Sequence, residues 1–196
     1  MKVVTLVSGG LDSTVMSVLV REESIEQFPV FVNYGQINLD REREACFRNF
    51  SRLGLPQPRV VELPGYGRAF TSGLTDPRKD IVRDAFLPGR NLLFLLCAGA
   101  VAHEVNADAI AIGLLDERLS LFPDQRRPFL VAASTLLREA LGRSITVLTP
   151  LRSFGKPEVL AIAKERGIQA TYSCHAGTVP PCGNCIACRE YDGLEV

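Results

Sequence analysis

The sequence predicts an α/β fold built on a doubly wound, mostly parallel sheet of five strands. Apolar runs rich in β-branched residues recur along the chain, and segments with helical spacing of apolar residues lie between or after them. Strands that alternate with helices favour a parallel sheet that is covered on both faces. A glycine-rich turn follows the first run. Together with right-handed crossovers, it indicates a Rossmann-like fold whose ligand lies at the carboxyl ends of the strands.

The expected strands lie near residues 2–7, 29–34, 59–63, 108–114 and 144–149. The expected helices lie near residues 13–22, 38–53, 90–105, 129–142 and 156–166. Residues 64–89 are rich in glycine, proline and charge, which is typical of a lid or binding loop. No repeat or low-complexity linker divides the chain. We therefore interpret residues 1–170 as one α/β domain and residues 171–196 as a four-cysteine tail packed on it.

Composition and charge limit the classes of function. Lys plus Arg and Asp plus Glu both number 22, so the formal charge is zero and gives no strong signal for nucleic-acid binding. The longest apolar stretch, residues 92–102, is too short to span a bilayer, and the N-terminus lacks a secretory pattern. We therefore expect no membrane partner and a reducing, cytoplasmic location.

A phosphate-binding loop is expected directly after the first strand, over Ser8, Gly9, Gly10, Leu11, Asp12, Ser13 and Thr14. Two glycines let the backbone take positive φ and approach a ligand closely, and N–H groups at the start of a helix favour a phosphate. The serines add hydroxyl donors, and Asp12 can hold the loop or a magnesium ion. No Gly-Lys-Ser/Thr follows, so this is not a Walker-type loop. The alternative is a structural turn with a plain N-cap.

Other candidates lie where later parts of the sheet end. Tyr34, Gly35 and Gln36 follow the second strand, where a nucleotide base or sugar can lie; the alternative is a turn with Gly35 at positive φ. Arg90 and Asn91 begin the most apolar helix. They can meet an anion and a heteroaromatic edge, or simply cap the helix.

The segment after the fourth strand carries charges at the same edge of the sheet. Asp124 is a candidate for the N–H face of a guanine-like ring and Arg126 for a carboxylate, although turn residues look similar. Lys156 begins a helix after the fifth strand and is a candidate for the phosphates of ATP, with a surface lysine as the alternative. The mixed charges of residues 40–44 are interpreted as a solvated helix face.

Four cysteines have the spacing of metal ligands: Cys174, Cys182, Cys185 and Cys188, in the pattern Cys-x7-Cys-x2-Cys-x2-Cys. Four thiolates form the closed tetrahedral shell of a structural zinc ion, which leaves no open position for catalysis. An iron–sulfur cluster accepts similar spacing, so spacing alone leaves the metal open, and free or paired thiols are a further alternative. His103 and His175 are not expected to be ligands.

The phosphate loop resembles that of the N-type ATP pyrophosphatases, which cleave ATP between the α and β phosphates and adenylate an oxygen of the substrate. Three further features follow it in order: a Pro-Gly-Arg-Asn turn at residues 88–91, a Pro-Asp-x-Arg segment at residues 123–126, and the four cysteines. This ordered set resembles the 7-cyano-7-deazaguanine synthase family, which makes the nitrile precursor of queuosine. The resemblance covers nearly the whole chain.

The resemblance implies an AMP-forming carbon–nitrogen ligase. ATP adenylates 7-carboxy-7-deazaguanine, and ammonia displaces AMP to give an amide. A second ATP then activates the amide oxygen, and loss of AMP leaves the nitrile. The cofactors implied are ATP, Mg²⁺ and a structural Zn²⁺, and the implied assembly is a homodimer.

The resemblance also implies roles for residues. The phosphate loop would hold the ATP phosphates with help from Lys156, and Tyr34-Gly35-Gln36 matches a Tyr-Gly-Gln element of the family. The deazaguanine and acyl-adenylate site would be lined by Arg90, Asn91, Asp124 and Arg126. The catalytic residues would be Asp12, Arg90, Asp124, Arg126 and Lys156, and the zinc ligands the four cysteines.

Several positions differ from the family pattern. Ile37 and Asn38 stand where Arg-His is usual. Arg118 stands where an Asp is usual, Gln125 stands where a Cys is usual, and the first cysteine gap is one residue short. These differences surround the reacting acyl group, so one alternative is a ligase that couples the activated acyl group to another amine, including a protein amine. Two further alternatives are a tRNA thiolase and a nucleotide sensor that binds ATP without releasing pyrophosphate.

Overall fold

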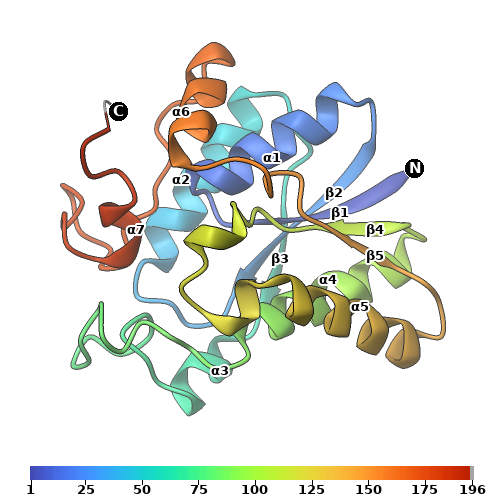
Figure 1. Ribbon diagram of the computed structural model, residues 1–196, viewed down its shortest axis with the longest axis horizontal. Helices are drawn as coiled ribbons and strands as arrows, with labels where there is room; N and C mark the ends of the chain where they lie inside the picture. The colour runs from blue at the N-terminus through green and yellow to red at the C-terminus, as the bar shows by residue number, and fades with distance from the viewer. Residues whose placement is uncertain (195–196) are drawn as a thin grey trace.

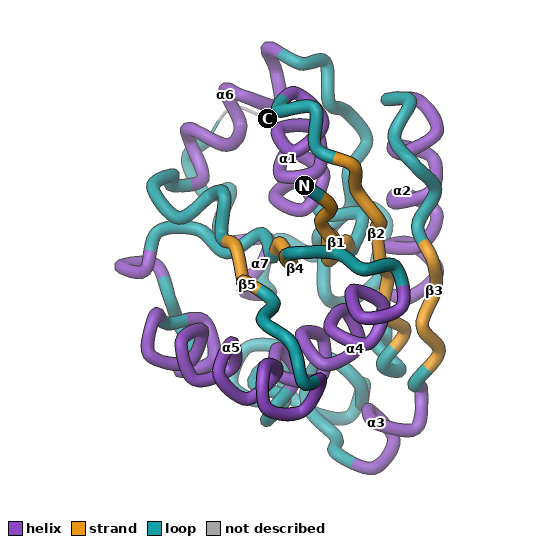
Figure 2. Tube along the Cα trace, turned by 90° about the vertical axis from the view of Figure 1, so that its right-hand side faces the viewer, coloured by secondary structure: helices purple, strands orange, loops and turns teal. Residues whose placement is uncertain are grey.

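The computed structural model describes residues 1–194 and contains a parallel sheet of five strands in the order β3-β2-β1-β4-β5 (Figures 1 and 2). The strands are β1 (Lys2–Val7), β2 (Glu26–Asn33), β3 (Arg59–Glu62), β4 (Ala109–Ala111) and β5 (Thr146–Leu148). Every neighbouring pair is parallel. The chain moves outward from β1 to β3 and then returns to the other side of β1 with β4, so the predicted doubly wound sheet is confirmed.

Helices cover both faces of the sheet (Figure 1). One face carries α1 (Leu11–Glu22), α2 (Leu39–Arg52) and α6 (Lys156–Glu165), and the other carries α4 (Arg90–Glu104) and α5 (Arg127–Leu141). Two short helices were not predicted: α3 (Pro64–Ala69), inside the segment expected to be a loop, and α7 (Ile186–Arg189), inside the tail. Both are too short to show the apolar periodicity that revealed the longer helices.

Both faces of the central strand are apolar, because β1 is buried between two layers of helices. Val3 and Val7 pack in the cluster that includes residues of α1, α2 and α6. Val4 and Leu6 point to the opposite face and pack with α4 and α5. The turn that follows β1 is therefore anchored in the centre of the core.

The carboxyl ends of β1, β2 and β4 meet at one edge of the sheet, where the strand order reverses. A side chain at Gly113, just beyond β4, would lie 3.3 Å from the backbone nitrogen of Ser13. The segment after β4 therefore passes directly against the start of α1. In open α/β sheets this is the place where ligands bind.

Residues 171–194 pack on the same edge. The backbone N–H of Tyr172 donates to the carbonyl oxygen of Gly9 at 3.0 Å, and Asn38 Nδ2 donates to the carbonyl oxygen of Cys174 at 3.1 Å. The last two residues of the tail that was predicted over residues 171–196 lie outside the described residues. Within residues 1–194 none of the helices has the length and apolar character needed to cross a membrane.

Candidate nucleotide site and cysteine centre

The phosphate loop connects β1 to α1 and is shaped by its own backbone and hydroxyl groups. Gly9 has φ +83°, and a Cβ there would lie 2.3 Å from the carbonyl oxygen of Glu42, so only glycine fits. Ser13 Oγ accepts the N–H of Ser8 at 3.2 Å and lies 3.3 Å from Ser8 Oγ. The N–H groups at the start of α1 lie at this loop, which makes it a place where an anion can bind.

Two residues of the predicted loop have structural roles. Thr14 is buried, and its Oγ1 donates to the carbonyl oxygen of Gly10 at 2.8 Å. Thr14 lines neither of the two cavities described below, and its hydroxyl stabilises the first turn of α1; its contact with a nucleotide stays a prediction. Leu11 packs in the core and also reaches the lining of the smaller cavity.

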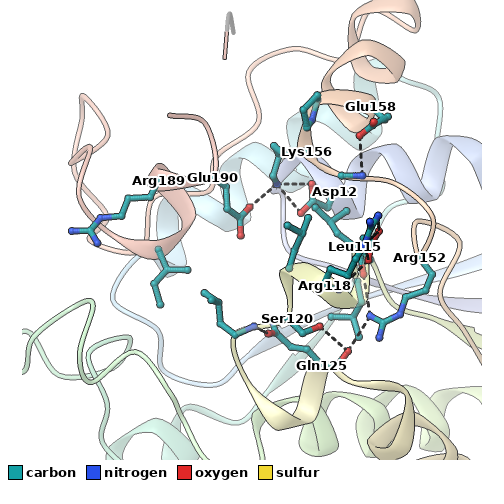
Figure 3. Close-up of a pocket in the computed structure, with 18 of the residues that line it drawn as sticks. Asp12, Leu115, Arg118, Ser120, Gln125, Arg152, Lys156, Glu158, Arg189 and Glu190 are labelled. Atoms are coloured by element: carbon teal, nitrogen blue, oxygen red, sulfur yellow. Dashed lines mark hydrogen bonds and ion pairs between the residues drawn. The ribbon is translucent and has the colours of Figure 1, made fainter. Parts of the chain in front are cut away.

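The predicted phosphate lysine lies beside the loop, at the start of α6. Lys156 Nζ lies 2.8 Å from Asp12 Oδ1 and 2.7 Å from Glu190 Oε2 (Figure 3). Lys156 is 6% exposed, so the alternative of a surface lysine is wrong. Burial lowers the pKa of Lys156, but the charges of Asp12 and Glu190 outweigh burial and hold the pKa above its usual range. The amino group is therefore charged at the edge of the loop.

A cavity of about 250 Å³, here called the small cavity, opens in front of the phosphate loop. The rings of Tyr34 and Phe94 form part of its lining, with centroids 5.4 Å apart. The guanidinium of Arg90 lies over both rings, 6.0 Å from the centroid of Tyr34 and 5.9 Å from that of Phe94. Flat aromatic and cationic surfaces of this kind suit a planar heterocycle.

The Tyr34-Gly35-Gln36 element is the turn that supports this cavity. Gly35 has φ +88°, so the turn given as the alternative is present. Gln36 Oε1 accepts the N–H of Tyr34 at 3.0 Å, and its Nε2 donates to Val32 O at 3.4 Å and to Glu42 Oε2 at 3.1 Å. Gln36 therefore uses its amide to position its neighbours. Burial raises the pKa of Tyr34 to about 12, so its hydroxyl stays protonated.

The charge pattern places Glu42 on a solvated helix face, and this prediction is wrong. Glu42 lies in the first turns of α2 and lines the small cavity. Burial raises its pKa to about 7, although hydrogen bonds from Gln36 and Asn38 and the charge of Arg90 oppose the rise. One signal in the sequence could have revealed the position of Glu42. A helix that starts at the carboxyl end of an inner strand has its first residues close to the edge of the sheet where ligands bind.

His175 also lines the small cavity, although the sequence suggested no role for it. Its Nδ1 is buried and has no hydrogen-bond partner within residues 1–194. Burial lowers the pKa of the imidazole to about 4, and the charge of Arg90 acts in the same direction. The backbone N–H of His175 donates to Cys185 Sγ at 3.4 Å, so the cysteine tail holds this side chain at the cavity.

The four predicted substrate residues do not all line the same cavity. Arg90 and Asn91 line the small cavity, whereas Asp124 and Arg126 line neither cavity. Asn91 Nδ2 donates to the carbonyl oxygen of Asp124 at 3.0 Å, and Asp124 Oδ2 accepts the backbone N–H of Asn91 at 3.4 Å. Asp124 therefore supports Asn91 at the start of α4, and its expected contact with substrate stays a prediction. Arg126 is exposed and directly precedes α5.

A larger cavity of about 1100 Å³ adjoins the small one (Figure 3). The two share the residues Asp12, Gly113, Leu114, Lys156 and Glu190. Arg118 lines the larger cavity and pairs with Asp116, and hydrogen bonds from Arg118 lower the pKa of Asp116 to about 2. Arg152 Nη1 donates to the carbonyl oxygens of Leu115 and Gln125, both at 3.0 Å, and so joins two parts of the rim.

The structure brings the four predicted metal ligands together. The sulfur atoms of Cys174, Cys182, Cys185 and Cys188 all lie within 4.8 Å of one another. Cys182 and Cys188 have their Sγ atoms 3.9 Å apart. Zn–S bonds of about 2.3 Å place tetrahedral sulfurs about 3.8 Å apart. Backbone N–H groups also donate to these sulfurs, as they do around metal-bound thiolates. The cluster fits one four-coordinate ion.

Comparisons with known proteins agree with this architecture. The family model described as queuosine biosynthesis protein QueC matches residues 2–193. A 7-cyano-7-deazaguanine synthase of Sulfurovum sp. (strain NBC37-1) is 31% identical over 211 residues, which cover 100% of this chain and 94% of the relative. A protein of the same name from Persephonella marina is 32% identical, over 96% of this chain and 89% of the relative.

Two solved structures share the fold. A predicted subunit of a tRNA methyltransferase from Methanocaldococcus jannaschii has a TM-score of 0.56 at 18% identity, over 84% of this chain and 75% of that chain. NMN synthetase from Francisella tularensis has a TM-score of 0.56 at 14% identity, over 99% of this chain and 78% of that chain. At these identities the likeness shows the fold alone.

Proposed function

The chain belongs to the QueC family of queuosine biosynthesis proteins, and from this membership we propose that it adenylates 7-carboxy-7-deazaguanine with ATP and converts it with ammonia to 7-cyano-7-deazaguanine. One observation carries the proposal: the glycine-containing loop and Lys156 lie beside a cavity that is lined in part by the aromatic rings of Tyr34 and Phe94. This arrangement offers a place for phosphates next to a place for a planar ring.

The chemistry follows from the need for a leaving group. A carboxylate oxygen of the substrate attacks the α-phosphorus of ATP, and pyrophosphate leaves. Ammonia then attacks the acyl carbon and AMP leaves, because adenylation has made the oxygen a good leaving group. A second adenylation, on the amide oxygen, allows loss of AMP and two protons to give the nitrile.

This chain's residues would bind and neutralise the phosphates. The N–H groups at the start of α1 and the charged Lys156 offset the negative charge that builds up in the transition state. Asp12 and Glu190 present carboxylate oxygens beside the loop and would hold Mg²⁺, which prefers such donors and would further neutralise the phosphate charge. Arg90 and Asn91 would contact the substrate from the start of α4.

We propose that the cysteine centre holds Zn²⁺ in a structural role, because four thiolates leave no position open for substrate. The support is the sulfur geometry together with the contacts that the tail makes with the phosphate loop. The family resemblance also implies a homodimer in the cytoplasm. Light scattering on the zinc-loaded protein tests the dimer.

A second candidate function differs only in the amine. The larger cavity, of about 1100 Å³ beside Asp12 and Lys156, offers space for ATP and for a molecule that carries an amine. An amine carried by a larger molecule, including a protein, would attack the acyl-adenylate there. The reaction would then stop at a substituted amide, because nitrile formation needs an unsubstituted one.

The test is mass spectrometry of the products from purified protein, magnesium-ATP and 7-carboxy-7-deazaguanine, with and without ammonium. A nitrile together with AMP and pyrophosphate supports the synthase. An acyl-adenylate without nitrile supports the second candidate. No ATP turnover by the zinc-loaded protein contradicts both. Lys156→Met should lower AMP formation by about 10²–10³-fold, whereas Lys164→Met, on the exposed side of α6, should not change it.

A further inference from the structure

The small cavity is sized for one ring system. Its volume of about 250 Å³ exceeds the roughly 150 Å³ that accepts benzene in another protein, and it lies below the roughly 300–1000 Å³ typical of pockets for larger ligands. Tyr34, Phe94 and Arg90 form one wall of the cavity, with the two rings inclined at 55° to each other and the guanidinium about 6 Å from both centroids. A bicyclic heterocycle therefore fits this cavity better than a whole nucleotide does.

One carboxylate in this lining is held in place from two sides. The amide of Gln36 is itself fixed by the Tyr34 N–H and the Val32 carbonyl oxygen, and it donates to Glu42 Oε2 at 3.1 Å. The backbone of Glu42 is packed under Gly9, which leaves no room for movement of α2 towards the loop. Gln36 occupies one lone pair of Glu42 Oε2, and Asn38 also stabilises this carboxylate. The remaining lone pairs are available to a ligand in the cavity.

The chemistry of a carboxylate selects one kind of ring edge. A guanine-type ring presents two donors side by side, the ring N1–H and the 2-amino group, and an ionised carboxylate accepts from both. Burial raises the pKa of Glu42 to about 7 in the empty cavity, and two such donors stabilise its ionised form. An adenine ring presents its amino group next to the lone pair of N1, and this lone pair is repelled by a carboxylate. Proteins that read single bases combine such edge contacts with stacking on aromatic rings or on Arg.

We propose that Glu42 binds the 2-amino edge of the deazaguanine substrate, with the ring stacked on the wall formed by Tyr34, Phe94 and Arg90. The inference rests on the proposed function and adds a residue that determines substrate specificity. It also moves the recognition of the N–H face from Asp124, which lies outside the cavity, to Glu42, which lines it.

The first measurement needs no variant. Isothermal titration would compare the binding of 7-carboxy-7-deazaguanine to the wild-type protein with that of the same compound lacking the 2-amino group. Loss of one of the two donors should weaken binding about 10-fold or more. Equal affinity for the two compounds would overturn the assignment of Glu42.

The second measurement uses Glu42→Gln with Glu44→Gln as the matched control. Glu44 lies on the same helix, but its side chain is 60% exposed and pairs with Arg48. In Glu42→Gln the amide NH₂ opposes a donor of the ring, so the KM for 7-carboxy-7-deazaguanine should rise about 10–100-fold while the KM for ATP stays within two-fold. The preference for the compound with the 2-amino group should also disappear. Glu44→Gln should match the wild type in all three.

Failure of this inference is distinct from failure of the proposed function. If the wild type forms AMP with this substrate and Glu42→Gln changes only the KM for ATP, Glu42 faces the adenine ring, and the inference falls while the function stands. If the wild type neither binds nor adenylates the deazaguanine, both fall. If Glu42→Gln fails to fold, the comparison of the two compounds binding to the wild-type protein still tests the inference.

Discussion

The phosphate loop and the cysteine tail meet at the same cavity, but they are held in different ways. The loop joins a strand and a helix that are both buried in the main core, and its serines bond within the loop. The tail, over residues 171–194, has one four-residue helix and a small cluster of Cys174, Cys185 and Ala187. From this difference we expect that the core of the domain shapes the loop, whereas ligation of the proposed ion by the four cysteines shapes the tail.

The tail nevertheless completes the site. It places His175 in the small cavity and Glu190 against Lys156. If the tail loses its order, the side chains of His175 and Glu190 should therefore be lost from the site while the sheet stays folded. Three substitutions, taken in order of expected effect, test whether the two regions are stabilised independently.

The largest effect is expected from removal of a metal ligand. Cys185 is fully buried, and Cys185→Ser or chelation removes a site of a kind that contributes about 10–16 kcal/mol in small zinc domains. We expect loss of the bound ion by elemental analysis, rapid proteolysis within the tail, and a fall in AMP formation of about 100-fold or more. Far-ultraviolet circular dichroism should still show the α/β domain.

The control is Cys97→Ser, in a half-buried thiol of α4 outside the cluster. It should retain the metal and the protease resistance of the tail. If the tail of Cys185→Ser resisted proteases as well as the wild-type tail does, the hypothesis that metal ligation shapes the tail would be contradicted.

The next largest effect is expected in the loop. Gly9→Ala adds a Cβ 2.3 Å from a backbone oxygen at φ +83°, so the loop or α2 must move. We expect a loss of about 2–4 kcal/mol in the free energy of unfolding, measured with urea, together with weaker ATP binding. The metal content should not change, because the clash lies in the core-anchored region.

The matched control is Gly65→Ala. Gly65 lies in α3 with no atom within 4 Å of an added Cβ and without a positive φ. Alanine there should stabilise the protein slightly, by about 0.5 kcal/mol. Equal and small effects of the two substitutions would show that the loop is not constrained as described.

The two regions also differ in how far the sequence predicts them. The strand expected at residues 2–7 is Lys2–Val7, and the helix expected at residues 90–105 is Arg90–Glu104. These elements follow from local apolar periodicity, and the phosphate loop and the cysteine cluster follow from local spacing. Features that are encoded within a few neighbouring residues were therefore predictable.

Features that depend on contacts between distant residues were not predictable. Glu42 and Glu44 belong to the same charged run, yet only Glu42 lines the cavity, because α2 packs on Gly9. His175 is adjacent to a cysteine, and only the folded tail shows that its ring faces the cavity. Asp124 hydrogen-bonds to Asn91, and of these two residues only Asn91 lines the small cavity.

The smallest effect is expected at the contact between the two regions. Asn38 is buried, and its Nδ2 atom donates to the carbonyl oxygen of Cys174, whose side chain is one of the four predicted metal ligands. Asn38→Ala leaves that carbonyl without its partner and should cost about 1–2 kcal/mol. If the tail is organised by its metal, this loss should appear as faster hydrogen exchange around Cys174 while the ion is retained.

Asn184→Ala provides the comparison, because Asn184 is exposed and its Oδ1 accepts only from Arg189 within the tail. Its effect should stay within about 0.5 kcal/mol. Release of the metal in Asn38→Ala would mean that the domain, through this single hydrogen bond, holds the cysteines in register. The two regions would then form one cooperative unit. A tail that is organised by its ion alone would instead keep the ion after the loss of this hydrogen bond to the domain.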